Sequence, residues 1–180
     1  MIQSKADLKE FLKADAFVYG GRKTPRFFGD EQWKYVIALR KREYYQNTGK
    51  NKLMHLYYRF KHRRMSLKLG FDIPCNVFGK GLKINHFGCI IVNPKAKIGD
   101  WCDIHQGVNI GESVDKCAPV IGENVWIGPG AKLFGNITIG NNVMVGANAV
   151  VNKSFDDNVA VAGVPAKVIN TNGNAYAKKF

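Results

Sequence analysis

Several features that would assign this chain to other classes of protein are missing from its 180 residues. The four cysteines include no Cys-x-x-Cys pair, which argues against a zinc site and against a disulfide framework. No stretch approaches the roughly 18 apolar residues that a membrane-spanning helix needs. Residues 1–17 are charged throughout and lack the apolar core of a signal peptide. We therefore expect a soluble, cytoplasmic protein with reduced cysteines and no metal.

Acidic residues are scarce in the first part of the chain, where basic residues are abundant. Residues 1–70 contain 17 Lys and Arg but only 6 Asp and Glu, whereas residues 71–180 contain 10 and 8. Most of the net charge of +13 therefore lies before residue 71. We predict a basic, helical N-terminal region over residues 1–70, a β domain over 71–170 and a C-terminal tail over 171–180.

A six-residue repeat fills most of the predicted β domain. From Val92 to Phe155 the chain divides into hexads that begin with Ile, Leu or Val and carry a small or apolar residue at the fifth position. The step from Ile110 to Ile121 is longer, which indicates an insertion around the sequence DKCAP. Neither a helix nor a simple strand has this period. The pattern predicts a triangular parallel β-solenoid in which the first residue of each hexad points inward and Gly and Asn occupy turns.

The sequences KINHFGCIIVN, VWIGPGAKLFGN and AGVPAKV carry a resemblance to a known family. The hexads resemble the left-handed β-helix of hexapeptide-repeat acyltransferases, and residues 70–170 are similar to the serine O-acetyltransferase branch. The resemblance implies a mainly β fold, a left-handed parallel β-helix with a short helical N-terminal region. It also implies acetyl-CoA as the co-substrate and a homotrimer with active sites between subunits. Residues 1–70 do not resemble the long helical domain of bacterial serine acetyltransferases.

The resemblance places His86 at the family's catalytic histidine. Transfer of an acetyl group to a hydroxyl needs a base, and an imidazole with a pKa of about 6.5 can take the hydroxyl proton and return it to the departing thiolate. His86 also falls at the first position of a hexad, where Ile or Val is expected, and repeats tend to break their pattern at functional sites. The alternative is a hydrogen-bonded histidine at a subunit contact. Asp72 matches the family's orienting aspartate, or else caps a turn.

The residues that match the family's acceptor site lack its charges. The aspartate that precedes the catalytic histidine in serine acetyltransferases is Asn85 here, and an Arg-His pair of the family aligns with Cys117 and Ala118. A zwitterion such as serine needs a carboxylate for its ammonium group and a cation for its carboxylate. We therefore predict a neutral sugar hydroxyl as the acceptor. His105 is the second candidate for the base, or else a polar residue of the acceptor groove.

Small residues after the insertion match the groove in which the resembling enzymes bind acetyl-CoA, between neighbouring subunits. Small side chains let the pantetheine arm approach closely, an indole can pack against it, and lysines can contact the phosphates. For each glycine, turn geometry is an equally good explanation. The predicted coenzyme-binding residues are Trp126, Gly128, Pro129, Gly130, Ala131, Ala147, Asn152, Lys153 and Lys167.

Three segments of the basic region predict helices: residues 7–13, residues 30–47 with Asp30 as the N-cap, and residues 51–70. One interpretation is a solvated cap whose apolar residues cover the open end of the β-helix. Another is peripheral contact with the inner face of an anionic membrane, or steering of an anionic acceptor. Nucleic acid is not expected as a partner, because no nucleic-acid fold signature accompanies the charge.

Together these features predict an acetyl-CoA-dependent O-acetyltransferase that modifies a sugar of a surface polysaccharide or its precursor. The first alternative is a serine O-acetyltransferase of cysteine biosynthesis. An alternative of another class is a non-catalytic β-helix that serves as a scaffold or binding protein.

Overall fold

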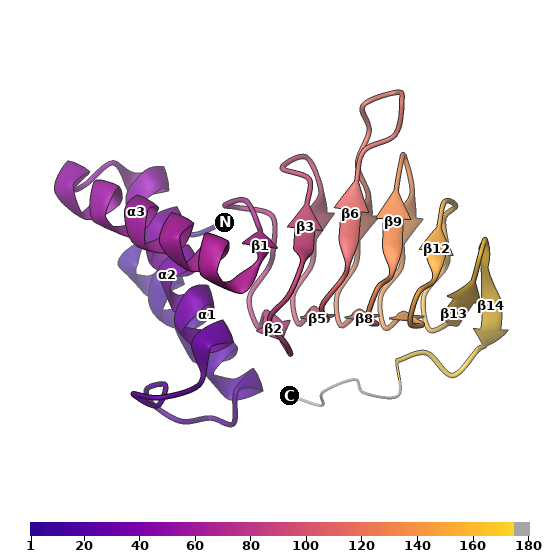
Figure 1. Ribbon diagram of the computed structural model, residues 1–180, viewed down its shortest axis with the longest axis horizontal. Helices are drawn as coiled ribbons and strands as arrows, with labels where there is room; N and C mark the ends of the chain where they lie inside the picture. The colour runs from indigo at the N-terminus through magenta and orange to yellow at the C-terminus, as the bar shows by residue number, and fades with distance from the viewer. Residues whose placement is uncertain (175–180) are drawn as a thin grey trace.

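The computed structural model describes residues 1–174 and contains three helices followed by a triangular β-solenoid (Figure 1). The helices lie together at one end of the solenoid and are α1 (Lys5–Val18), α2 (Glu31–Thr48) and α3 (Lys52–Leu69). All three predicted helices are therefore present, and the parallel solenoid confirms the predicted left-handed β-helix class. α3 ends at Leu69 and the last strand at Asn170, and the division into domains stays a prediction.

The strands form three sides and pair in parallel, except for an antiparallel hairpin at the end. The first side contains β1 (Phe71–Asp72), β3 (Ile90–Val92), β6 (Asn109–Gly111), β9 (Lys132–Phe134) and β12 (Val150–Val151). The second side contains β4 (Lys97–Ile98), β7 (Val120–Ile121) and β10 (Thr138–Ile139). The third side contains β2 (Lys83–Ile84), β5 (Asp103–Ile104), β8 (Trp126–Ile127), β11 (Met144–Val145), β13 (Ala160–Gly163) and β14 (Ala166–Asn170).

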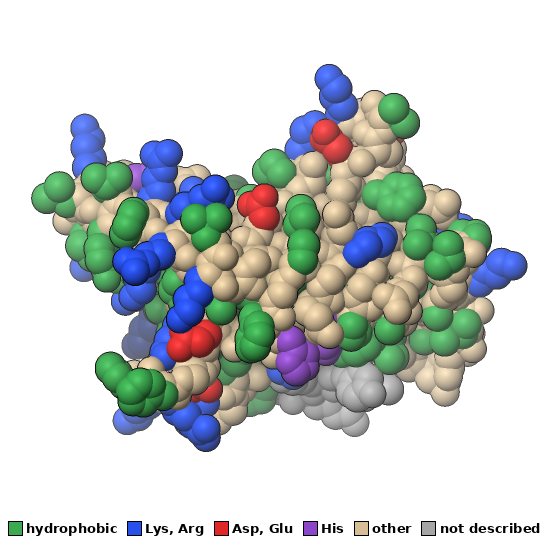
Figure 2. Space-filling view, in the orientation of Figure 1, with side chains coloured by type: hydrophobic (Ala, Val, Ile, Leu, Met, Phe, Trp, Pro, Cys, Tyr) green, Lys and Arg blue, Asp and Glu red, His purple; other side chains and the backbone are tan. Residues whose placement is uncertain are grey.

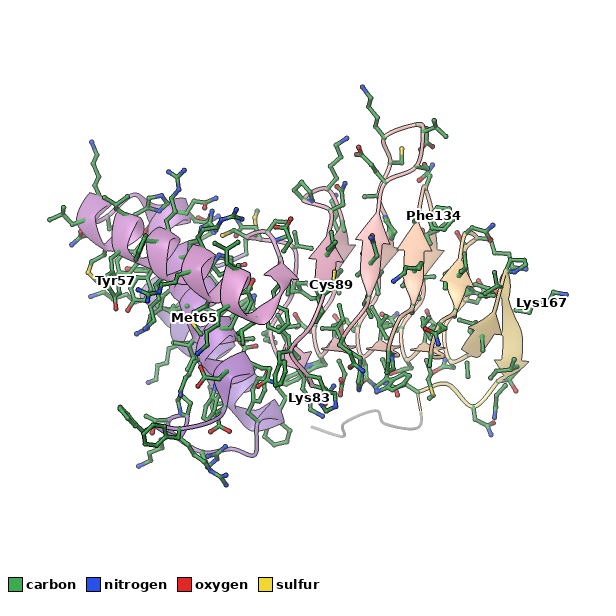
Figure 3. All side chains as sticks on the ribbon, viewed as in Figure 1. Tyr57, Met65, Lys83, Cys89, Phe134 and Lys167 are labelled. Atoms are coloured by element: carbon green, nitrogen blue, oxygen red, sulfur yellow. The ribbon has the colours of Figure 1, made fainter. Side chains whose placement is uncertain are left out.

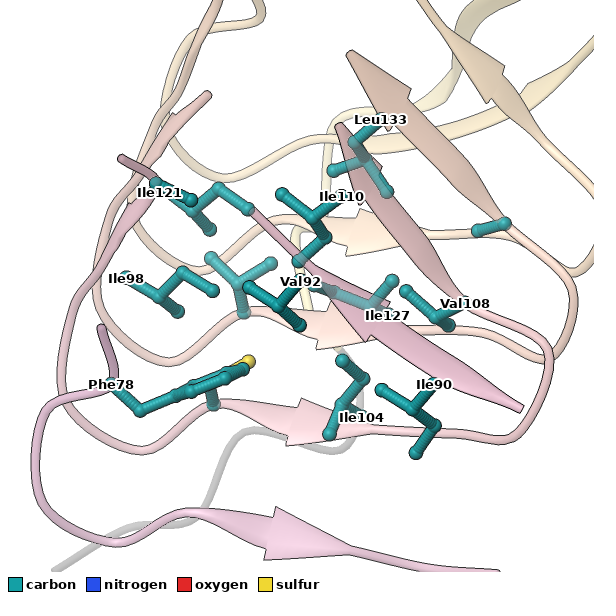
Figure 4. Close-up of a cluster of buried hydrophobic side chains, with 14 of the residues drawn as sticks. Phe78, Ile90, Val92, Ile98, Ile104, Val108, Ile110, Ile121, Ile127 and Leu133 are labelled. Atoms are coloured by element: carbon teal, nitrogen blue, oxygen red, sulfur yellow. The ribbon is translucent and has the colours of Figure 1, made fainter. Parts of the chain in front are cut away.

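The first residues of the hexads fill the interior of the prism, as the repeat predicts. Figure 4 shows such side chains stacked from coil to coil, and the following are buried: Val92, Ile98, Ile104, Ile110, Ile121, Ile127 and Leu133. The predicted insertion forms a loop that projects between β6 and β7 (Figure 1). Val114, the fifth residue of its hexad, is fully exposed because it lies in this loop. The hexad frame is therefore interrupted there.

The first coil departs from the repeat at the corner between β2 and β3. Ile84 pairs with Ile104, whereas Ile91 pairs with Asn109, so the first coil has two more residues at this corner than the second coil. Ile84 therefore occupies the inward position, and the prediction that His86 does so is wrong. The extra residues shift the frame and leave the His86 side chain exposed. We call residues 85–90 the enlarged corner.

The helices close one end of the prism. Tyr35, Val36 and Leu39 of α2 and Leu69 of α3 belong to the same buried core as Phe71 of the first coil. Burial of these side chains removes the apolar end of the solenoid from water, which is the role that the cap interpretation gives them.

Asp30 precedes α2 at the N-cap position but does not cap the helix. Its φ of 55° is left-handed and its side chain makes no capping hydrogen bond. The carboxylate instead pairs with the Arg22 guanidinium at 2.9 Å and accepts a hydrogen bond from the Arg26 N–H. These contacts lower the pKa of Asp30 and tie down the α1–α2 loop.

A buried ionic cluster joins the helices to the first coil. The Arg40 guanidinium donates to Asp15 (2.9 Å), to Glu43 (3.2 Å) and to the carbonyl of Phe78 (3.0 Å). Asp15 also accepts from the N–H of Gly81 at 2.8 Å. Burial alone would lower the pKa of Arg40, but the two carboxylates raise it above its usual value, so the guanidinium remains protonated.

His62 on α3 should make the fold sensitive to mild acid. Burial, and secondarily the Arg42 guanidinium whose Nη1 is 2.8 Å from His62 Nδ1, lower the pKa of His62 to about 4. Below pH 6.5 the unfolded chain binds a proton that the folded chain does not, so the free energy of unfolding decreases as the pH falls. We expect His62 to account for a loss of about 1.5 kcal/mol between pH 6.5 and pH 5. Urea unfolding of His62→Gln should lack this part of the pH dependence, and His55→Gln should retain it.

Candidate active site

The helical region holds the enlarged corner on both sides. Before the corner, the Tyr19 hydroxyl accepts a hydrogen bond from the N–H of Ile84 at 2.9 Å. After His86, the carbonyl of Leu69 at the end of α3 accepts from the N–H of Gly88 at 2.9 Å. His86, Phe87 and Cys89 of this segment are exposed and would otherwise be free to move, so these bonds give His86 a defined place.

A second histidine lies next to His86. The ring centroids of His86 and His105 are 6.3 Å apart, and Figure 2 shows histidine side chains at the surface near the helical end of the solenoid. The Nδ1 of His105 is 3.1 Å from the carbonyl of Ile127, and because a carbonyl only accepts, Nδ1 carries the proton. Burial lowers the pKa of His105, so the ring is neutral near pH 7 and its Nε2 can accept a hydrogen bond. The ring of Trp126 packs 4.8 Å from that of His105.

Asp103 belongs to the same cluster and was missed by the sequence interpretation. Its carboxylate accepts a hydrogen bond from the Asn85 amide, lies 3.8 Å from His105 Nδ1 and is 3.3 Å from the Lys83 ammonium group (labelled in Figure 3). Alternation along a strand puts residues two apart on one face, so the spacing of Asp103 and His105 could have revealed this carboxylate. Within residues 1–174, no group of three His, Cys, Asp or Glu side chains is arranged to hold a metal ion.

Asn85 has a structural role that its sequence position did not indicate. Its side-chain amide donates to Asp103, and its carbonyl accepts from the Gln32 side chain of α2 at 3.4 Å. Asn85 therefore connects the helices, the enlarged corner and the next coil.

Three other predicted site residues lie apart from the histidines in the single chain. Asp72 is exposed on β1, beside a groove lined by basic residues of α2 and α3, and no hydrogen bond among residues 1–174 joins it to His86. Cys117 and Ala118 lie in the inserted loop, before β7. Their predicted roles, as the orienting carboxylate and as acceptor contacts, stay predictions.

Most of the predicted coenzyme residues lie in later coils, at the same corner of the prism as His105. Residues 128–131 follow β8, and Ala147 follows β11. Gly128 also has a structural explanation, because a Cβ there would lie 2.7 Å from the Trp126 ring and 2.8 Å from the carbonyl of Val145. Close stacking of coils thus requires this glycine whether or not coenzyme binds.

The remaining coenzyme candidates lie elsewhere. Asn152 and Lys153 follow β12 at the next corner of the prism, and Lys167 lies on β14 of the terminal hairpin. The structure therefore divides the predicted set between two corners and the far end of the solenoid.

Comparison with known proteins agrees with this architecture. A family model described as bacterial transferase hexapeptide (six repeats) matches residues 118–153. The repeat is that of the bacterial hexapeptide transferases. The serine acetyltransferase of Synechococcus elongatus is 39% identical over 111 residues, which make up 59% of this chain and 46% of that protein. The chain spans about half the length of the curated relatives it matches.

Solved hexapeptide transferases extend the similarity to the helices. The serine acetyltransferase from Brucella abortus in complex with coenzyme A has a TM-score of 0.78 at 27% identity, covering 95% of this chain and 71% of that chain. The enzyme from Neisseria gonorrhoeae in complex with serine has a TM-score of 0.74 at 27% identity, covering 92% and 70%. Because 95% of this chain is covered, the similarity of fold includes most of residues 1–70. Repeat, fold and relatives together fit a hexapeptide-repeat acyltransferase of the serine O-acetyltransferase branch.

Proposed function

We propose that this protein is an acetyl-CoA-dependent O-acetyltransferase in which His86 is the general base. The observation that carries the proposal is the enlarged corner, where two extra residues present an exposed imidazole beside His105. A coil that served only to stack would have no need of this departure from the repeat. The solved relative with bound coenzyme A supports the choice of acyl donor.

The proposed reaction uses one residue as both base and acid. His86 takes the proton of the acceptor hydroxyl while the hydroxyl oxygen forms a bond to the acetyl carbonyl carbon. Backbone N–H groups at the corner would stabilise the resulting oxyanion. When the carbon–sulfur bond breaks, the imidazolium returns the proton to the thiolate. His105, neutral with an accepting Nε2, would bind the acceptor. Asp72 does not contact His86 in the single chain, so we propose that it orients His86 only once the subunits assemble.

The proposed site is completed by other subunits. His86 is exposed in the single chain, whereas a base needs a cleft that positions both substrates and excludes water. We propose a homotrimer in which acetyl-CoA lies between subunits along residues 128–131 and Ala147, near Trp126. Lys153 and Lys167 would then contact its phosphates.

Serine is the acceptor that the relatives support, in preference to a sugar. Asp103 adds a structural argument, because it supplies a carboxylate next to His105, hydrogen-bonded to the Asn85 that replaces the family's aspartate. An ammonium group could bind this carboxylate, although Lys83 already neutralises part of its charge.

A sugar hydroxyl remains the second candidate. The observation that favours it is the absence of a cationic side chain at Cys117 and Ala118, where the resemblance expects an Arg-His pair. A buried carboxylate without a cation is costly, and a neutral acceptor avoids this cost. Modification of a surface polysaccharide or its precursor belongs to this candidate.

Thiol release from acetyl-CoA by the purified protein, with serine or neutral sugars as acceptors, tests the proposal. We expect release that depends on serine. Asp103→Asn should raise the KM for serine by roughly 10- to 100-fold, because a hydrogen bond to a charged group contributes about 1.5–3 kcal/mol, and should leave the KM for acetyl-CoA unchanged.

Lys83→Gln is the matched control, since it removes the partner of Asp103 but keeps the carboxylate, and it should not raise the KM for serine. A higher kcat/KM with a neutral sugar would select the second candidate. If no acceptor gives thiol release, the proposed acetyltransferase activity is contradicted and a non-catalytic scaffold is favoured.

A further inference from the structure

The outer face of α3 carries an apolar stripe that the protein leaves in water. Its buried face, which includes Tyr58 and His62, packs against the rest of the molecule. On the opposite face, apolar residues recur at spacings of three, four and seven, which aligns them along one side of a helix. This stripe consists of Leu53, Leu56, Tyr57, Phe60 and Leu67, each of which is at least half exposed. Figure 3 labels Tyr57 near the outer end of the helix.

Basic residues flank the stripe, and acidic residues are absent from the helix. The exposed cations of α3 are Lys52, Arg59, Lys61, Arg63, Arg64 and Lys68. No Asp or Glu occurs between Glu43 and Asp72. An apolar stripe between cationic rows is the pattern of a helix that lies in the headgroup layer of a membrane.

A second apolar element lies close to the stripe. Phe27 and Phe28, in the α1–α2 loop, are 86% and 84% exposed. The Lys34 ammonium group donates to the carbonyl of Phe27 at 2.7 Å and lines a groove together with Phe60 and Arg64 of α3. The loop, the groove and the stripe therefore form one continuous surface. Figure 2 shows hydrophobic and basic side chains mixed over α3 and over this loop.

We propose that this surface docks the protein onto an anionic phospholipid bilayer, with α3 parallel to the membrane plane and Phe27 and Phe28 inserted beside it. Among residues 1–174, no helix is long and apolar enough to span a bilayer, so the contact would be interfacial. The expected depth is that of other interfacial helices, about 5–10 Å into the boundary between headgroups and acyl chains.

The charge of the surface argues against two other occupants. A second copy of the same surface would bring two acid-free cationic helices together, and like charges repel. A nucleic acid would satisfy the cations but would leave Leu53, Leu56 and Leu67 without an apolar partner. An anionic bilayer satisfies both the cations and the apolar side chains.

Docking would hold the candidate site near the membrane surface. α3 ends at Leu69, whose carbonyl binds the N–H of Gly88 in the enlarged corner. The helix that contacts lipid is thus hydrogen-bonded to the segment that carries His86. This inference does not depend on the proposed activity, because lipid binding can be measured without substrates.

Cosedimentation of the full-length protein with vesicles tests the inference. We expect binding to vesicles of phosphatidylcholine mixed with phosphatidylserine, little binding to phosphatidylcholine alone, and release by added salt. A triple variant, with Lys61→Gln, Arg64→Gln and Lys68→Gln, should lower the partition coefficient onto these vesicles roughly 100-fold. Each Lys or Arg near an anionic surface contributes about a factor of five to that coefficient. Leu56→Ser with Phe60→Ser should abolish the binding that persists at moderate salt.

Two control variants are matched to these changes. The charge control removes the same number of cations from the solenoid and combines Lys95→Gln, Lys97→Gln and Lys116→Gln. The apolar control removes two exposed apolar side chains outside the helices and combines Val114→Ser with Ile169→Ser. Both should bind vesicles as the unmodified protein does. If the charge control loses as much vesicle binding as the α3 charge variant, the attraction is nonspecific and the inference is overturned. A change of molecular mass in solution on Leu56→Ser with Phe60→Ser would instead make the stripe an interface between copies.

Discussion

Replacement of His86 by alanine should lower kcat by about 10²–10⁴-fold while the protein remains folded and keeps its affinity for acetyl-CoA. The expected loss is large because no other group would then deprotonate the acceptor hydroxyl at the same position. The backbone should tolerate the change, since the side chain is exposed and the corner is held by hydrogen bonds to Tyr19 and Leu69. Thiol release, coenzyme binding by calorimetry and mass by light scattering should be measured together.

Two control variants accompany His86→Ala. His105→Gln tests the neighbouring histidine, and His55→Ala tests the effect of losing a histidine elsewhere. If His105 only binds the acceptor, His105→Gln should mainly raise the acceptor KM, and His55→Ala on α3 should leave both constants unchanged. Near-normal turnover of His86→Ala together with inactive His105→Gln would transfer the role of base to His105.

Replacement of Arg40 by alanine should be the most destabilising single change in the helical region. It would leave the buried carboxylates of Asp15 and Glu43 without their cation and the carbonyl of Phe78 without its donor. Loss of one partner from a buried ionic cluster typically costs about 3–5 kcal/mol. Urea unfolding, followed by circular dichroism, should show the loss.

Two further variants show whether the loss comes from uncompensated charge. Arg22→Ala breaks the partly exposed pair with Asp30 and should cost less than about 1 kcal/mol. Arg40→Met combined with Asp15→Asn and Glu43→Gln removes all three charges and should recover part of the stability. If this triple variant is less stable than Arg40→Ala, the hydrogen bonds of the cluster matter more than its charge.

The hexad pattern predicted most of the β domain because each coil repeats the same physical requirement. Stacking demands an apolar residue such as Ile104 or Ile127 at every inward position, and that demand is visible in the sequence. The three helices of the basic region were also predicted as elements. The exception is the cap at Asp30, which depends on backbone φ and on a partner eight residues earlier, Arg22.

The roles predicted for the site residues stay predictions, and the structure adds where these residues lie in the coils. The sequence pointed to His86 and His105, and the structure places their rings side by side. The hexad frame assigned His86 to the inward position that Ile84 occupies. The two extra residues lie in the first coil, and no earlier coil exists with which its length could be compared. Asp103 was missed because its partners Asn85 and Lys83 belong to another coil, and pairing between coils is not visible in a linear sequence.

The enlarged corner changes the surface of the solenoid without changing the strand pairing beside it. The strand pairs on either side of the corner keep their parallel register although the corner has extra residues, and the N–H of Gly107 in the next coil still binds the carbonyl of Cys89. A shortened protein that lacks two residues of the corner would have a first coil of regular length and would be expected to fold as an inert prism. If His86 is the base, the number of residues between two paired strands would decide whether its imidazole reaches the surface at this place.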